Sequence, residues 1–270
     1  MLSILFEKMK KKSKLRDYKI NTPQYEFYKE LHKNQTYNYV KTKLKQYSTN
    51  SNKKMTMNEV LSMMDKFIDP SDPDVSNENS IHAYQTAERI RKEQPLNLEL
   101  QVCGIIHDLG KILLNFNEPA WSVVGDTFVV GCEFAKSIVY YDTMKENPDY
   151  YNYIYNTKYG VYTPNCGIEK LLLSFGHDEY LYRVLQNNKN HKLSHKYQKI
   201  IRYHSFYSWH TGNDYKYFEI PSDNDIKQDV LEFNKFDLYS KEDINFVLTD
   251  EIKLYYKNLL TNFFPQELLW

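Results

Sequence analysis

The chain is organised around the sequence CGIIHDLGK at residues 103–111. Apolar residues occupy nearly every face of residues 98–114, which is typical of a central, buried helix. His107 and Asp108 stand side by side within it, and Lys111 shares their face at i+4 and i+3. Burying an imidazole with a carboxylate is costly unless something pairs with both. A metal ion is one such partner, and a hydrogen-bonded pair in an ordinary core is the alternative.

The composition favours an all-α protein. Among 270 residues only 8 are Gly and 9 are Pro, and helical periodicities far outnumber strand-like alternations. Lys+Arg and Asp+Glu balance at 35 each, so no nucleic-acid partner is expected. No apolar run reaches about 18 residues, so no membrane span is expected either. Cys103, Cys132 and Cys166 are scattered and odd in number, which favours a reducing, cytoplasmic location over a disulfide framework.

Residues 1–20 are rich in lysine and are expected to form a solvated tail, with a nucleic-acid patch as the weaker alternative. Residues 21–270 then read as one domain. Its amphipathic helices are expected near residues 23–47, 57–67, 81–93, 194–206 and 252–260. Residues 144–166 look like an irregular, tyrosine-rich surface insertion, and the apolar end Leu268-Leu269-Trp270 is expected to dock.

A stiff acidic loop precedes the helix at 81–93. Two prolines in residues 69–74 bias the backbone away from helix and leave three carboxylates displayed. A plain acidic turn with helix caps explains this pattern. A grip for a polyol or a cation is the sharper interpretation, because carboxylates are strong acceptors for hydroxyl groups.

Further candidate ligands fall on other helices. His82 lies in the first turn after the acidic loop, and His204 lies on the apolar stripe of residues 194–206. Asp237 shares a core face with Val230 and Phe233. His177 opens a helix, whereas the neighbouring Asp178 is explained by helix-cap chemistry.

The collected set is more than one metal ion needs. It suits two ions that share a carboxylate, with Asp108 as the natural bridge. The set contains no thiolate, so iron or manganese is favoured and zinc remains open. The candidate ligands are His82, His107, Asp108, His177, His204 and Asp237.

This order of His and Asp resembles the HD-domain superfamily, and the closer resemblance is to the myo-inositol oxygenase family. It extends from residue 15 to residue 270 and rests on several stretches rather than on His-Asp alone. Those stretches are SDPDV (71–75), HAYQTAE (82–88), HDLGK (107–111), VVGDTF (123–128), GHDEY (176–180), HSFY (204–207), WHTG (209–212) and EFNKFDLY (232–239).

The resemblance implies a single HD-domain helical bundle of about five core helices with peripheral helices around it. It implies a mixed-valent Fe(II)/Fe(III) pair, with O2 as co-substrate. His82, His107, Asp108 and Asp237 match the ligands of one iron, while His177 and His204, with the bridging Asp108, match those of the other. The positions that match inositol-binding residues are Asp69, Ser71, Lys111, Gly125, Asp126, His204, Ser205 and Lys241, and Arg16 matches an arginine that closes over the substrate.

The implied reaction is a four-electron ring cleavage of myo-inositol to D-glucuronate, with hydrogen abstraction from C1, as the first step of inositol catabolism. Asp108 and Lys111 are the expected catalytic residues, Lys111 in substrate placement and proton handling. A cytoplasmic monomer is expected. The main alternative is an HD-type phosphohydrolase acting on a nucleotide, which should display more Arg and Lys near the metals. A binding scaffold without metal is a third reading.

Overall fold

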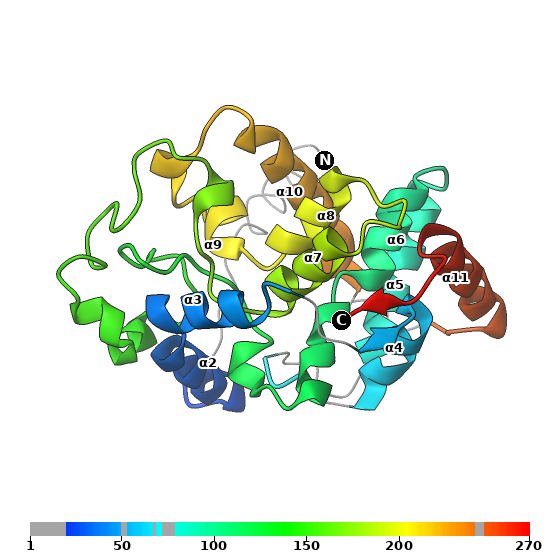
Figure 1. The fold of residues 1–270 in the computed structure, drawn as a ribbon, viewed down its shortest axis with the longest axis horizontal. Helices are drawn as coiled ribbons and strands as arrows, with labels where there is room; N and C mark the ends of the chain where they lie inside the picture. Colours follow the sequence, from blue (N-terminus) through cyan, green and yellow to red (C-terminus); the bar gives the residue numbers. More distant parts are fainter. Residues whose placement is uncertain (1–19, 50–52, 67–68, 72–78, 241–245) are drawn as a thin grey trace, which may run out of the picture.

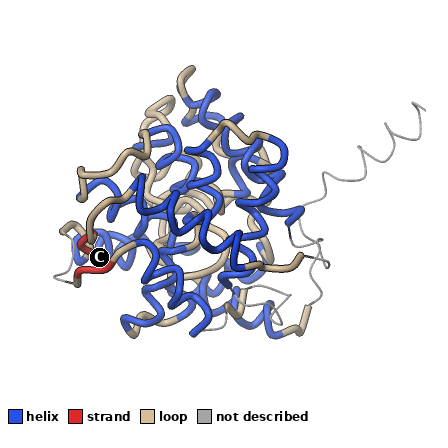
Figure 2. The backbone as a smooth tube through the Cα atoms, turned by 90° about the vertical axis from the view of Figure 1, so that its right-hand side faces the viewer, coloured by secondary structure: helices blue, strands red, loops and turns tan. Residues whose placement is uncertain are grey.

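In a computed structural model, the described part of the chain is a bundle of helices with two very short strands (Figures 1 and 2), which confirms the all-α prediction. The structure describes residues 20–49, 53–66, 69–71, 79–240 and 246–270. Arg16, Lys241 and the acidic-loop residues 72–74, all singled out from the sequence, lie outside these ranges.

In the first half of the chain, helices precede and follow the apolar run at residues 98–114 in the sequence. Threonine side chains cap several of them, and Thr56 forms a complete capping box with Glu59. The elements are α2 (Pro23–Asn34), α3 (Tyr37–Gln46), β1 (Lys54–Met55), α4 (Met57–Met63), η2 (Met64–Lys66), α5 (Asn79–Glu93), α6 (Leu98–Ile106), η3 (Leu109–Phe116) and η4 (Ala120–Ser122).

The second half begins with irregular chain and ends with long helices. Its elements are η5 (Tyr141–Glu146), η6 (Pro148–Tyr151), η7 (Ile168–Lys170), α7 (His177–Asn187), α8 (His195–Tyr203), α9 (Tyr207–His210), η8 (Lys216–Phe218), α10 (Asp223–Ser240), α11 (Asp250–Phe263) and β2 (Leu268–Leu269). Five helices from the two halves of the chain pack on one another, namely α5, α6, α7, α8 and α10.

The apolar run at 98–114 does not form one continuous helix, and that expectation was wrong. The α-helix ends at Ile106, His107 is its C-cap, and Asp108 adopts φ −95° and ψ −2° before the tighter η3 begins. Burial was predicted correctly, since the residues from Leu100 to Leu113 are all buried. His107 itself keeps helical dihedral angles, with φ −51° and ψ −34°, so the change in backbone conformation begins at Asp108.

The C-terminus is tied to the bundle, as expected. β2 pairs antiparallel with β1, so that Leu269 faces Lys54 and Leu268 faces Met55. Trp270 is almost fully buried, and its indole Nε1 donates to the Met55 carbonyl at 3.1 Å.

Residues 144–166 are irregular, as expected, but only part of the segment is at the surface. Tyr151 and Tyr153 are exposed, whereas Met144 and Asn147 are fully buried. The Asn147 amide donates to the carbonyls of His32 and Gln35, at the end of α2. The segment therefore also closes the last turn of that helix.

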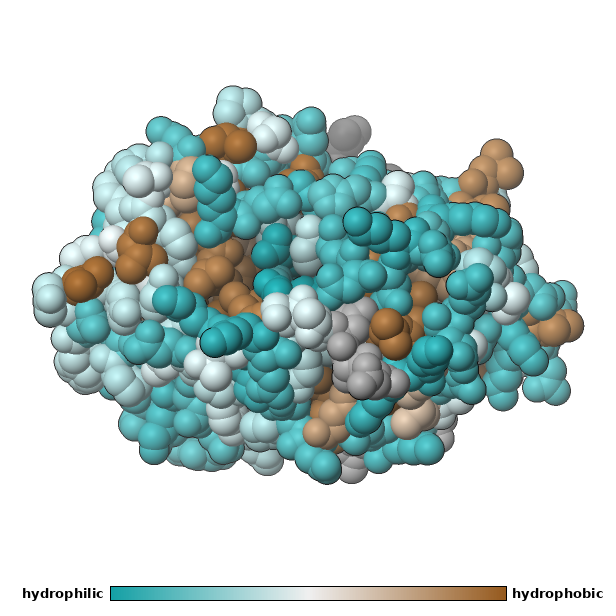
Figure 3. Space-filling view, viewed as in Figure 1, coloured by the Kyte–Doolittle hydropathy of each residue, from teal (hydrophilic) through white to brown (hydrophobic). Residues whose placement is uncertain are grey.

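The face of the molecule seen in Figure 1 is largely hydrophilic, and its apolar side chains form small separate patches (Figure 3). Among the described residues, no helix is both long and apolar enough to cross a membrane.

Buried His32 should make the stability of this fold depend on pH. Burial lowers the pKa of His32 from 6.5 to about 3. Between pH 6.5 and about pH 3 the unfolded chain binds a proton at His32 that the folded protein excludes. The free energy of unfolding should therefore decrease as the pH is lowered, by up to about 1.4 kcal/mol per pH unit. Chemical denaturation of a His32→Gln variant between pH 7 and pH 4 should show a smaller decrease in the free energy of unfolding than wild type shows. The exposed His195, changed to Gln, is the control and should keep the wild-type slope; equal slopes in all three proteins would contradict the prediction.

Candidate metal centre and adjoining pocket

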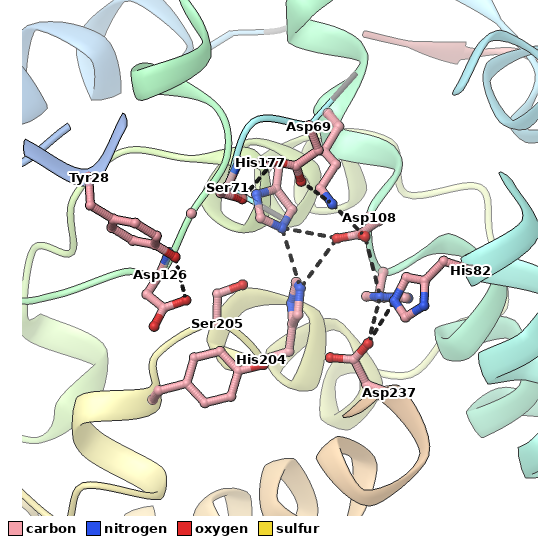
Figure 4. A pocket seen from close by; sticks show the side chains of 14 residues that line it. Tyr28, Asp69, Ser71, His82, Asp108, Asp126, His177, His204, Ser205 and Asp237 are labelled. Atoms are coloured by element: carbon pink, nitrogen blue, oxygen red, sulfur yellow. Dashed lines mark hydrogen bonds and ion pairs between the residues drawn. The ribbon is translucent and has the colours of Figure 1, made fainter. Parts of the chain in front are cut away.

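The structure brings all six predicted ligands together at one end of a pocket (Figure 4). Apart from the neighbours His107 and Asp108, they come from different helices, and most lie at a helix end rather than in a helix middle. His107 is the C-cap of α6, Asp108 is the N-cap of η3, His204 is the C-cap of α8, and His177 is the first residue of α7. Helix packing, not local sequence, therefore makes this cluster.

One set of ligand atoms joins α5, α6 and α10. His82 Nε2 lies 2.8 Å from Asp237 Oδ1, and His107 Nε2 lies 3.5 Å from the same oxygen. His107 Nε2 also lies 3.6 Å from Asp108 Oδ2. Two imidazoles and carboxylate oxygens at such separations can share a metal ion whose bonds are about 2.0–2.2 Å long.

A second set lies on the other side of Asp108. His177 Nε2 is 3.3 Å from His204 Nε2, and Asp108 Oδ1 lies 3.1 Å from the former and 3.6 Å from the latter. The two oxygens of Asp108 thus face different histidine sets. A carboxylate placed in this way can bridge two ions.

The ring nitrogens that point away from the cluster have backbone partners. Nδ1 of His107 lies 2.8 Å from the Gly104 carbonyl, and Nδ1 of His204 lies 2.8 Å from that of Ile201. Nδ1 of His177 lies 2.8 Å from the Val123 carbonyl. Donation from Nδ1 leaves the Nε2 lone pair of each ring directed at the cluster, which is the tautomer a metal ligand needs.

The electrostatics of the cluster favour a cation. Burial by itself lowers the pKa of His177, but the carboxylates of Asp178 and Asp108 raise it to about 10. Burial raises the pKa of Asp108, yet Lys111 and His107 hold it well below its ordinary value. Asp108 therefore stays ionised and favours positive charge at the Nε2 atoms that face it, which a proton or a metal ion can supply. The donor set thus fits a metal centre.

Lys111 connects this cluster to the loop at residues 69–71. Its Nζ lies 2.7 Å from Asp108 Oδ2 and 2.8 Å from Asp69 Oδ2. Asp69 Oδ1 accepts from both the backbone N–H and the hydroxyl of Ser71, so the loop forms a tight turn. Burial lowers the pKa of Lys111, but the two carboxylates raise it above its ordinary value, so the ammonium remains charged. Asp69 is thus both a turn former and a pocket residue.

The opposite wall of the pocket contains the remaining described residues predicted to bind substrate, namely Gly125, Asp126 and Ser205. Gly125 has φ +99°, which suits glycine. Sequence reasoning missed Tyr28 and Tyr207, which also line the pocket. The Tyr28 hydroxyl donates to Asp126 at 3.0 Å from a helix about 100 residues earlier (Figure 4), a contact that no local pattern signals.

Asp178 does not act as the helix cap expected from the sequence. The N-cap of α7 is Gly176, which makes no side-chain cap bond. Asp178 is instead fully buried, with Oδ1 2.7 Å from His177 Nε2. The expectation was wrong because the first turn of α7 packs against α8 and η3 rather than facing solvent.

The fold and these buried His/Asp clusters define a helical protein with a candidate metal centre, and sequence comparison identifies the family. The model of the family described as myo-inositol oxygenase matches residues 22–270. The inositol oxygenase of Mus musculus is 46% identical over 245 residues, covering 90% of this chain and 85% of that protein. That of Danio rerio is 43% identical over 244 residues (90% and 87%), and inositol oxygenase 1 of Arabidopsis thaliana is 44% identical over 248 residues (91% and 79%).

The chain therefore belongs to the myo-inositol oxygenase family. This confirms the resemblance inferred from the motifs, and with it the expectation that the protein is an oxygenase enzyme.

Gly110 provides a test of how the centre is held. A Cβ atom at Gly110 would lie 2.0 Å from the carbonyl oxygen of His177, so η3 and the start of α7 can approach this closely only at a glycine. Gly110→Ala should displace His177, lower stability by about 3 kcal/mol, and weaken metal binding.

Gly176→Ala is the matched control, because its Cβ would meet no atom closer than 3.4 Å and its φ is −160°. Denaturation and metal analysis of both variants check the prediction. Wild-type stability and metal content in Gly110→Ala would refute it.

Proposed function

We propose that this protein cleaves the ring of myo-inositol with O2 to give D-glucuronate, using two iron ions held by its buried His/Asp clusters. Family membership supports inositol as the substrate. One observation carries the two-metal part of the proposal: the two oxygens of Asp108 face two separate histidine sets. A core His–Asp pair, the alternative considered from the sequence, needs neither the second set nor a carboxylate with both oxygens engaged.

The ligand assignment follows from these contacts. His82, His107 and Asp237 would hold one ion. His177 and His204 would hold the other, and Asp108, whose two oxygens face both sets, would bridge them. Iron bound there would supply Lewis acidity toward a substrate oxygen and one-electron chemistry with O2. The sulfur-free donor set favours iron over metals that prefer thiolates.

The pocket beside the clusters suits a neutral polyol. Asp69 and Asp126 offer carboxylate oxygens and Ser205 offers a hydroxyl, all groups that bind sugar-like hydroxyls. Orienting the ring in one pose is the main contribution such residues can make, because reaction at a single carbon requires the others to be held away. Arg16 and Lys241, expected to complete the pocket, lie outside the described residues.

Lys111 is best assigned as a fixed hydrogen-bond donor and positive charge. Two carboxylates within 2.8 Å keep its ammonium protonated, so it cannot serve as a general base near neutral pH. It can donate to a substrate oxygen, and it holds Asp108 in the bridging orientation. This narrows the proton-handling role expected from the sequence.

The overall reaction balances without a further reductant. Ring cleavage between C1 and C6 removes four electrons from the substrate, and one molecule of O2 accepts them. One oxygen atom of O2 enters the carboxylate product and the other leaves as water. The protein's own residues supply ligands, substrate orientation and a buried site from which bulk water is largely excluded.

A nucleotide phosphohydrolase remains the second candidate, because it would use His82, His107, Asp108 and Asp237 in the same way. The pocket argues against it. Within the described part of the chain, Lys111 is the one Lys or Arg that lines the pocket, and Asp69 and Asp126 would repel a phosphate.

Oxygen uptake decides between these two functions. Iron-loaded protein with a reductant and myo-inositol should consume one O2 for each glucuronate formed, as measured with an oxygen electrode and product chromatography. Phosphate release from nucleotides without oxygen uptake would establish the second candidate and reject the first.

Lys111→Met should lower kcat/KM for inositol at least tenfold, about 1.4 kcal/mol of transition-state stabilisation, because the ammonium is lost while the side-chain volume is kept. Lys227→Met is the control, since Lys227 is equally buried and paired with Glu219 at 2.7 Å, but does not line the pocket. Steady-state kinetics of both variants, after their iron content is matched, give the comparison. Equal kcat/KM in wild type and Lys111→Met would remove Lys111 from the mechanism.

A monomeric state, a cytoplasmic location, a role in inositol catabolism and an N-terminal segment closing over the site remain predictions from the sequence.

A further inference from the structure

Asp178 is a buried carboxylate beside the centre that the ligand assignment above leaves out, although His177, Asp178 and His204 also form a group that could hold an ion. Asp178 is fully buried in the first turn of α7, directly after His177. Among the described residues, its Oδ2 has no hydrogen-bond partner. An ionised carboxylate in such a place is costly unless a positive charge lies close to it.

The contacts of Asp178 show which part of the centre it adjoins. Its Oδ1 lies 2.7 Å from His177 Nε2, 3.5 Å from His204 Nδ1, and 3.3 Å from the Ser205 hydroxyl, which donates to it. Asp178 thus contacts His204 at Nδ1, the nitrogen that faces the Ile201 carbonyl, and not at Nε2, which faces the cluster. At His177, Asp178 Oδ1 is as close to Nε2 as a ligand oxygen would be, but at His204 it faces Nδ1. An ion bound by Nε2 of both histidines and by Asp108 Oδ1 would therefore have Asp178 next to it, on the His177 side.

The two ligand sets differ in their own negative charge. The set of His82 and His107 contains Asp237 as well as one oxygen of Asp108. The set of His177 and His204 has only the other oxygen of the shared Asp108. Asp178 places a further carboxylate next to the set that has fewer carboxylates.

We infer that Asp178 is a positioning residue that balances the charge of the ion held by His177 and His204 without coordinating it, and thereby favours the ferric state at that ion. The inference rests on the proposed two-iron function. A fixed negative charge a few ångströms away stabilises a triply charged ion more than a doubly charged one, and burial keeps water from screening it. Asp178 also fixes the Ser205 hydroxyl at the pocket wall through the same oxygen.

A purely structural role is the competing explanation. Asp178 lies in the first turn of α7, where a carboxylate stabilises the helix through its dipole. That role would change the stability of the protein but not the redox properties of an ion, so the two explanations separate in a measurement of potential.

The test uses full-length wild type and Asp178→Asn, which removes the charge and keeps the shape and the acceptor for Ser205. Binding of Zn2+, a redox-inert probe, is measured by competition with a chromophoric chelator. The affinity for the second ion should fall roughly 10–100-fold in the variant. In the iron-loaded proteins, an EPR-monitored redox titration should give a higher potential for the mixed-valent couple, by about 59 mV if ferric iron loses tenfold more affinity than ferrous iron.

Asp223→Asn is the matched control. Asp223 is also buried, and it accepts backbone N–H groups of Ile168 and Ile220 at the start of α10, away from the pocket. It should lose stability without a change in potential or in second-ion affinity. Asp178→Ser removes the same charge in a smaller side chain and replaces Asp178→Asn if that variant does not fold.

The possible results separate the role of Asp178 from the proposed two-iron function. A wild type that binds one ion only would reject the two-iron proposal. A wild type with two ions, and an Asp178→Asn variant with the same potential and the same second-ion affinity, would reject the role of Asp178 alone. An equal shift in Asp223→Asn would also reject it, because the effect would then be structural.

Discussion

The carboxylate of Asp108 is the constraint on which the rest of the centre depends. It is buried, it stays ionised, and its two oxygens face two histidine sets while Lys111 binds one of them. Such a group is stable in a protein core only if all its neighbours are in place together. The two oxygens of Asp108 therefore depend on cationic and hydrogen-bond donor groups that only helix packing brings to them. The helices concerned are α5, α6, α7, α8 and α10.

Helix ends are the means by which the fold directs these ligands. The last carbonyls of a helix lack partners within the helix. His107 and His204, as C-caps, each have Nδ1 at the carbonyl three residues earlier, in α6 and α8 respectively. The same local geometry thus satisfies an orphan acceptor and fixes which ring nitrogen faces the centre. A histidine in a helix middle would find its i−3 and i−4 carbonyls already bonded.

Negative charge predominates around the centre and the pocket, and this affects which ligands can bind there. Carboxylates outnumber cations among the described pocket residues, with Asp69, Asp108, Asp126 and Asp237 against Lys111. That balance suits metal cations and a neutral polyhydroxylated substrate rather than a phosphate. The placement of Asp178 beside the set with fewer carboxylates extends the same pattern to the two ions proposed there.

The sequence by itself determined the helical class, the burial of the run around His107 and Asp108, and the residue types of the candidate ligands, because apolar periodicity and residue chemistry are local properties. It also carried enough family motifs to identify the relatives. Only the tertiary structure decided that the helix breaks at Ile106, that Asp178 turns inward, and that Tyr28 reaches Asp126. These features depend on contacts between residues far apart in the chain, such as Gly110 against the backbone of His177, and packing overrides local preference wherever two helices meet so closely.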